Sequence, residues 1–110
     1  MNYFDIVILN LKPNSTYSCN FKAWSDCEFD YSVKFNYGQL FINGNGAIIN
    51  GNDQSNNFMF VGLGAVVNVV NVTISKFNHC FINYGEVLCY GSSFVDNRLI
   101  SLMLVRYWVL

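Results

Sequence analysis

Short apolar runs alternate with asparagine and glycine along most of the chain. The clearest example is residues 40–52, which read LFINGNGAIINGN, and the same pattern returns over 58–62, 66–77, 81–85 and 87–97. Asparagine and glycine adopt left-handed backbone angles and close tight turns. Valine, isoleucine and the aromatic residues favour strands. The pattern therefore predicts many short strands joined by tight corners.

The individual strands follow from the period of the apolar positions. Residues 31–37 alternate with a period of two, which is typical of a half-buried strand. Strands are also predicted over 2–11 and 16–21, joined by a turn at Pro13 that proline, asparagine and serine favour. Residues 66–77 are long enough for a helix, but their β-branched residues favour a strand. Residues 22–30 have no clean period and are expected to form an excursion, with a helical turn as one option. We expect turns at Gly44, Gly46, Gly51, Gly85 and Asn97.

The recurring punctuation indicates internal repetition. Leu40, Val72 and Val87 each begin a triplet with apolar residues at its first and third positions. We expect these three residues to lie in neighbouring parallel strands, although their spacing is irregular. An alternative register pairs Val66 with Val87, a separation close to the usual unit of about 20 residues or more in a repeat protein.

Three motifs resemble those of right-handed parallel β-helix proteins. Residues 81–97, FINYGEVLCYGSSFVDN, are similar to the family's repeat of a strand, an N-x-G turn and an alternating strand that closes on asparagine. Residues 42–51, INGNGAIING, resemble the entry strand IDGNGxxIDG, and residues 71–75, NVTIS, resemble another common element. The resemblance covers roughly residues 37–97, and it is to Asn-rich adhesin-like surface proteins of methanogenic archaea and polymorphic outer-membrane proteins of bacteria. Asn43 and Asn50 stand where the family usually has aspartate.

The resemblance implies an all-β chain folded as a right-handed parallel β-helix, a solenoid of about three to five coils. It implies N-terminal strands and a cap over residues 1–38, coils over 39–97, and an atypical apolar strand or truncated coil over 98–110. Inward-facing side chains would stack in the core. The expected core residues are Leu40, Ile42, Ile48, Phe60, Val72, Ile74, Val87, Cys89 and Phe94.

Composition and charge narrow the partners. Apolar residues make up 53% of the chain, charged residues only 12%, and 16 of the 110 residues are asparagine. The net charge is −1 and the basic residues are scattered singly, which argues against binding nucleic acid. No apolar run has the length of a membrane span, and nothing at Met1 resembles a signal peptide. The apolar tail after Arg98 is the opposite of the polar cap that a solenoid end needs. We therefore expect a fragment of a longer extracellular or cell-surface protein whose export signal lies elsewhere.

The four cysteines have no C-x-x-C spacing, so a zinc knuckle is not expected. Cys19 and Cys27 are close enough to bridge a loop, and Cys80 and Cys89 could face each other across one coil. Four cysteines allow three pairings. The other interpretation is that all four are reduced, small core residues.

Chemically active groupings are sparse. Asp26, Glu28 and Asp30 occupy alternate positions, so on a strand they would share one face and form a weak calcium site, and otherwise they form a solvated acidic loop. The neighbours His79 and Cys80 would point to opposite faces of a strand, which excludes a nucleophile–base pair.

Aromatic side chains give a further possibility. Tyr31, Phe35 and Tyr37 would stack on sugar rings if exposed and would form core if buried.

These features favour a non-catalytic, adhesin-like β-helix segment that needs no cofactor. It would serve as a structural stalk or as a module that contacts glycans or other cell-surface proteins. The alternative is a degenerate carbohydrate-active β-helix, similar to pectate lyases, that cleaves or binds polysaccharide.

Overall fold

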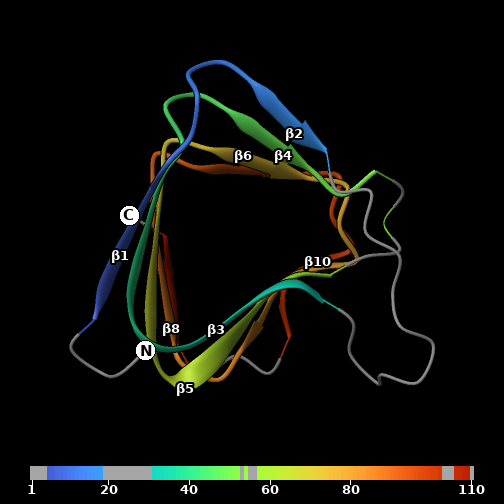
Figure 1. Cartoon of the computed structure of the whole chain (residues 1–110). Helices are drawn as coiled ribbons and strands as arrows, with labels where there is room; N and C mark the ends of the chain where they lie inside the picture. The colour runs from blue at the N-terminus through green and yellow to red at the C-terminus, as the bar shows by residue number, and fades with distance from the viewer. Residues whose placement is uncertain (1–4, 19–30, 53, 55–56, 103–105, 110) are drawn as a thin grey trace.

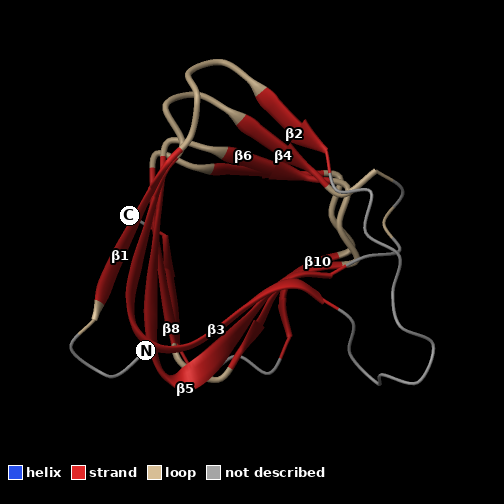
Figure 2. Cartoon of the chain, viewed as in Figure 1, coloured by secondary structure: helices blue, strands red, loops and turns tan. Residues whose placement is uncertain are grey.

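A computed structural model describes residues 5–18, 31–52, 54, 57–102 and 106–109, and it describes 31–33, 101–102 and 106–109 only as backbone. Every regular element in this part of the chain is a β-strand (Figure 2). The all-β class expected from the sequence is therefore confirmed. The strands are β1 (Ile6–Asn10), β2 (Thr16–Ser18), β3 (Tyr31–Asn43), β4 (Ile48–Asn50), β5 (Asn57–Val70), β6 (Thr73–Ser75), β7 (His79–Asn83), β8 (Glu86–Tyr90), β9 (Ser93–Val95), β10 (Leu99–Leu102) and β11 (Arg106–Val109).

The strands form two parallel sheets (Figure 1). Within the described residues, sheet A has seven strands in the order β1-β3-β5-β7-β10, with β8 beside the second half of β5 and β11 beside β8. Sheet B has four strands in the order β2-β4-β6-β9. Figure 1 shows sheet B across the interior from β3 and β5. Buried apolar residues of both sheets, such as Ile42 on β3 and Ile74 on β6, belong to one core cluster.

Paired residues lie closer together in sequence toward the C-terminal side. Ile6 pairs with Gln39, a separation of 33 residues, and Gln39 pairs with Val66, a separation of 27. Val66 pairs with Glu86, and Glu86 pairs with Arg106, both separations of 20. Sheet B shows the same decrease. Thr16 pairs with Ile48, Ile48 with Thr73 and Thr73 with Ser93, at separations of 32, 25 and 20 residues.

The predicted register was wrong at one of its three residues. Leu40 pairs with Val67, and Val67 pairs with Val87, so Val72 is not in this row. Val72 follows the end of β5 and lies buried in a corner, because Asn71 before it has a φ of 51° and turns the chain. The predicted strand over 66–77 is consequently the end of β5, a corner, and β6.

The first set of corners, between sheet A and sheet B, is a column of left-handed residues. Asn14, Asn45, Asn71 and Gly91 have φ values of 53°, 53°, 51° and 58°. Backbone hydrogen bonds join neighbouring corners, since Asn14 N donates to Asn45 O and Gly46 N donates to Asn71 O. Asparagine and glycine are the residues that adopt this conformation at least cost. The Asn-rich punctuation thus places the turns that lead into β2, β4, β6 and β9.

The second set of corners follows sheet B and has a less typical composition. Gln54, Lys76 and Asp96 have φ values of 66°, 61° and 56°. Gln54 N donates to Lys76 O, and Lys76 N donates to Val95 O, so these corners also stack. The side-chain amide of Asn97 joins its own corner to the neighbouring one. Its Oδ1 accepts a hydrogen bond from Phe77 N, and its Nδ2 donates to Ile74 O.

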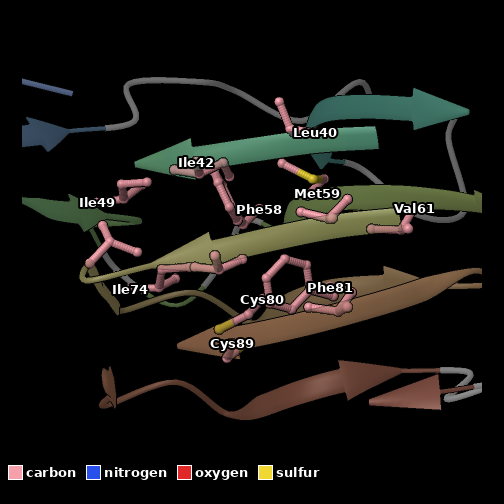
Figure 3. Packing of buried hydrophobic residues seen from close by; sticks show 14 of the residues in the cluster. Leu40, Ile42, Ile49, Phe58, Met59, Val61, Ile74, Cys80, Phe81 and Cys89 are labelled. Atoms are coloured by element: carbon pink, nitrogen blue, oxygen red, sulfur yellow. The ribbon is translucent and has the colours of Figure 1, made fainter. Parts of the chain in front are cut away.

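The core lies between the two sheets (Figure 3). Aromatic rings run through it, with Phe58 and Phe77 centroids 5.3 Å apart and Phe81 and Phe94 centroids 6.2 Å apart. Of the expected core residues, the structure buries Leu40, Ile42, Val72, Ile74, Val87 and Cys89, and packs the half-buried Phe94 against them.

Two expected core residues face outward instead. Ile48 is 39% exposed and Ile49 takes the inward position, because a shift of one residue in a strand exchanges its two faces. Phe60 lies on the outer face, beside Lys34 in the register of β3 and β5.

The ends of the described chain continue the same two sheets. β3 runs across position 38, where a boundary was expected, and β1 and β2 pair with β3 and β4. At the other end, β10 and β11 pair in parallel with β7 and β8.

Candidate ligand-binding groove

The groove is located at the corner where sheet A turns between its two halves. Paired positions on either side of this corner are separated by different numbers of residues in neighbouring strands. β3 advances four residues, from Phe35 to Gln39, and β5 advances five, from Val61 to Val66. The chain from β7 to β8 advances three, from Asn83 to Glu86. Because β5 has more residues here than either neighbour, its corner must project outward from the sheet.

The projecting residue is Leu63, which is 83% exposed and has a glycine on each side. At Gly62 the backbone of β5 comes so close to β3 that an added Cβ would lie 2.7 Å from the Asn36 Cα. At Gly85 an added Cβ would lie 2.4 Å from the carbonyl oxygens of both Gly62 and Ala65. Glycine is therefore required at both positions, because the backbones of neighbouring segments approach closely there.

A cavity of about 430 Å³ opens at this corner, lined by Asn36, Tyr37, Phe60, Gly62, Leu63 and Tyr84. We call this cavity the corner groove. Its volume is within the range of sites that hold small ligands. None of these six residues has a carboxylate, an imidazole or an amine side chain.

Aromatic rings form the walls of the corner groove. The Phe60 and Tyr84 centroids are 5.5 Å apart with the ring planes at 40°. Tyr37 is 42% exposed. The Lys34 Nζ lies 5.6 Å from the Phe60 centroid, over the ring, so a positive charge stands at one end of the wall. Such a surface can hold the apolar face of a ring-shaped ligand, with Asn36 and the tyrosines on its polar edge.

Of the two aromatic side chains in β3 that were singled out and are described, Tyr37 lines the corner groove and Phe35 does not. Phe35 is 6% exposed and belongs to the core, whereas Tyr37 is exposed. They occupy different faces because the pairing of β3 with β5 shifts between them. The side chain of Tyr31 is outside the described part. Sequence reasoning missed Phe60, Leu63 and Tyr84 as site residues, since only the unequal corner lengths bring them together.

A second hollow, of about 450 Å³, lies at the N-terminal end of the interior. Apolar side chains and Tyr17 line it, among them Val7 and Leu9 from β1. It is continuous with the core, since Leu40, Ile42 and Phe58 also line it.

His79 forms a polar cluster at the start of β7. Its Nδ1 lies 3.0 Å from Asn57 Oδ1 and 3.0 Å from Asn78 Nδ2, and Arg98 Nη1 donates to Asn78 Oδ1 at 3.0 Å. Burial, and secondly the charge of Arg98, lower the pKa of His79 below its usual 6.5.

Cys80, the neighbour of His79, is fully buried, and burial together with Cys89 raises its pKa to about 12. A thiol held protonated in this way is a poor nucleophile. Cys80 and Cys89 are both present as buried thiols, and both are core residues (Figure 3).

The remaining sequence candidates fall elsewhere. Asp26, Glu28, Asp30, Cys19 and Cys27 are outside the described residues. Among the residues that are described, no group of three or more histidine, cysteine, aspartate or glutamate side chains could hold a metal ion. The described part of the chain also contains no helix with the length and apolar character needed to cross a membrane.

Comparison with family models, with curated proteins and with solved structures gives no match to this chain. The function must therefore be argued from the corner groove and the arrangement of the strands.

Proposed function

We propose that this chain is a right-handed parallel β-helix segment that contacts glycans at a cell surface without cleaving them. The chain alternates between sheets A and B, and each return to a sheet adds a parallel strand. Parallel crossovers are right-handed in nearly all proteins, which supports the handedness. The stacked corners, with their left-handed residues in columns, support the coiled path.

The observation that carries the proposed function is the corner groove. It is concave, it has aromatic walls, and neighbouring backbone segments pack closely at Gly62 and Gly85. Aromatic side chains offer a large apolar face, with a polar hydroxyl at its edge in tyrosine, and such a face can pack against a sugar ring. The groove forms because the corners of β3, of β5 and between β7 and β8 differ in length. A chain that served only as a structural stalk would not need this local feature.

Binding without cleavage fits the chemistry of the lining. Cleavage of a glycosidic bond usually requires a pair of carboxyl groups about 5 to 10 Å apart on either side of it. Among the described residues that line the corner groove, none has a carboxylate or an imidazole side chain. We therefore favour a binding module over a degenerate polysaccharide lyase or hydrolase. We propose a cell-surface location because the motifs at residues 42–51 and 81–97 resemble those of adhesin-like surface proteins.

A glycan-binding screen with groove variants tests the proposal. We expect Tyr84→Ala and Tyr37→Ala each to weaken binding roughly two- to tenfold, the range for an aromatic contact. Tyr90→Ala is the matched control, because Tyr90 is also a partly exposed tyrosine but lies on β8 outside the groove. Folded protein that binds no glycan would reject the proposed function. Turnover of any polysaccharide would reject its non-catalytic part.

A further inference from the structure

The charge beside the corner groove bears on the kind of sugar that it would select. Lys34 is exposed on β3, and the register places it directly beside Phe60 on β5. Its ammonium group lies over the face of a ring that also lines the groove. An incoming ligand on the groove wall would therefore meet a positive charge at the Phe60 end.

None of the described residues that line the groove carries a negative charge. The nearest carboxylate along the chain from Tyr84 is Glu86, which lies on β8 past Gly85 and is not a lining residue. The Lys34 ammonium lies 5.6 Å from the Phe60 centroid, so its charge stands beside the groove wall and within reach of a ligand that contacts this ring.

We infer that the corner groove selects a sugar that carries a carboxylate, with the ring against Tyr84 and the carboxylate directed to Lys34. This inference rests on the proposed glycan-binding function and specifies its ligand class. Both uronic acids and sialic acids have this chemistry. Neutral sugars would retain the ring contact but would lose the charge contact.

The test compares each acidic sugar with the methyl ester of the same sugar, so that only the charge of the carboxyl group differs. The ligands are sialyllactose, a galacturonic acid trimer, and their methyl esters, titrated against the whole chain by calorimetry at low salt. We expect the acid to bind roughly two- to fivefold more tightly than its ester, the range for an exposed ion pair. Added salt should reduce this preference.

Variants assign the preference to Lys34. Lys34→Gln should remove the difference between acid and ester, and Lys34→Arg should retain it because the charge is kept. Lys12→Gln is the matched control, since Lys12 is an exposed lysine at another corner. If the protein prefers the acid over the ester for only one of the two sugars, that sugar identifies whether the ligand is a uronic acid or a sialic acid.

The outcomes separate this inference from the proposed function. Equal binding of acid and ester, with loss in Tyr84→Ala, would overturn the selection for a carboxylate and leave glycan binding intact. Preference for the acid that persists in Lys34→Gln would overturn the role of Lys34. Folded protein that binds neither these sugars nor any neutral glycan would overturn both proposals.

Discussion

Replacement of Asn97 by alanine should destabilise the fold strongly. The Asn97 Oδ1 accepts a hydrogen bond from Phe77 N at 2.9 Å, and its Nδ2 donates to Ile74 O at 2.8 Å. One side chain therefore satisfies two backbone groups of the neighbouring corner. Phe77 is fully buried, so water cannot easily replace the lost acceptor.

The magnitude follows from these two bonds. Each hydrogen bond contributes about 1 kcal/mol net, and a buried N–H left without a partner costs about 1–3 kcal/mol. We therefore expect Asn97→Ala to lower the free energy of unfolding by about 2–4 kcal/mol. That loss is a large fraction of the roughly 5–15 kcal/mol that stabilises an ordinary domain.

Urea unfolding followed by far-ultraviolet circular dichroism measures this change, provided that the denaturant slope is unchanged. Asn10→Ala is the control. The Asn10 Oδ1 also accepts a side-chain hydrogen bond, from Asn43 Nδ2 at 2.8 Å, but this bond is exposed to solvent. We expect the control to lose no more than about 0.5 kcal/mol. If the two variants lose the same stability, bridging of the corners by Asn97 does not stabilise the fold as argued.

Three further predictions concern backbone, protonation and thiol chemistry. Gly85→Ala should cost about 1–3 kcal/mol or more, because its Cβ would collide with two carbonyl oxygens. Gly91→Asn should change stability by less than about 1 kcal/mol, since Gly91 has a φ of 58° and nothing within 4 Å of an added Cβ. Because the pKa of His79 is lowered in the folded state, the unfolded chain takes up a proton at this histidine at a higher pH than the folded chain does. The free energy of unfolding should therefore fall as the pH drops through 6.5, and it should fall by a smaller amount in His79→Gln. Alkylation of Cys80 near neutral pH, followed by peptide mass spectrometry, should be slow in the native protein and rapid after unfolding, because its pKa is raised to about 12.

Each of these has a result that contradicts it. Equal stability of the two glycine variants would mean that the close approach at Gly85 can relax. A pH dependence that is identical in His79→Gln would assign it to other groups. Rapid native labelling of Cys80 would show that the core opens locally.

The sequence allowed prediction of the strands and corners because their signals are local. Proline, asparagine and glycine marked the corners at Asn14 and Asn45, and Gly85 and Asn97 were assigned to turns that the structure contains. The corner at Asn71 was missed, because it was placed inside a predicted strand over 66–77. Lys76 gave no such signal, although its φ of 61° places it in a corner. A left-handed lysine is uncommon, and its corner is fixed by stacking on its neighbours rather than by its own preference.

Register and groove could not be predicted because they depend on contacts between distant segments. Val72 and Val67 both fit an apolar triplet, and only the pairing with Leu40 and Val87 selects Val67. Ile48 and Ile49 are adjacent isoleucines, so the sequence alone does not say which faces the core. Phe60 was expected inside because it is apolar, and only the register of β3 and β5 places it beside Lys34 on the outer face.

The decreasing separation of paired residues has a consequence for the order of folding. Closing a loop of 33 residues costs about 0.4 kcal/mol more entropy than closing one of 20 residues. The strands β5, β8 and β11, which pair at a separation of 20, can therefore associate first and offer an edge to the rest. β1, which pairs at 33 residues and has two side chains about 60% exposed, Ile6 and Ile8, would dock last. Amide hydrogens in β1 should accordingly exchange with solvent through fraying, while those between β5 and β8 exchange only when the whole chain unfolds.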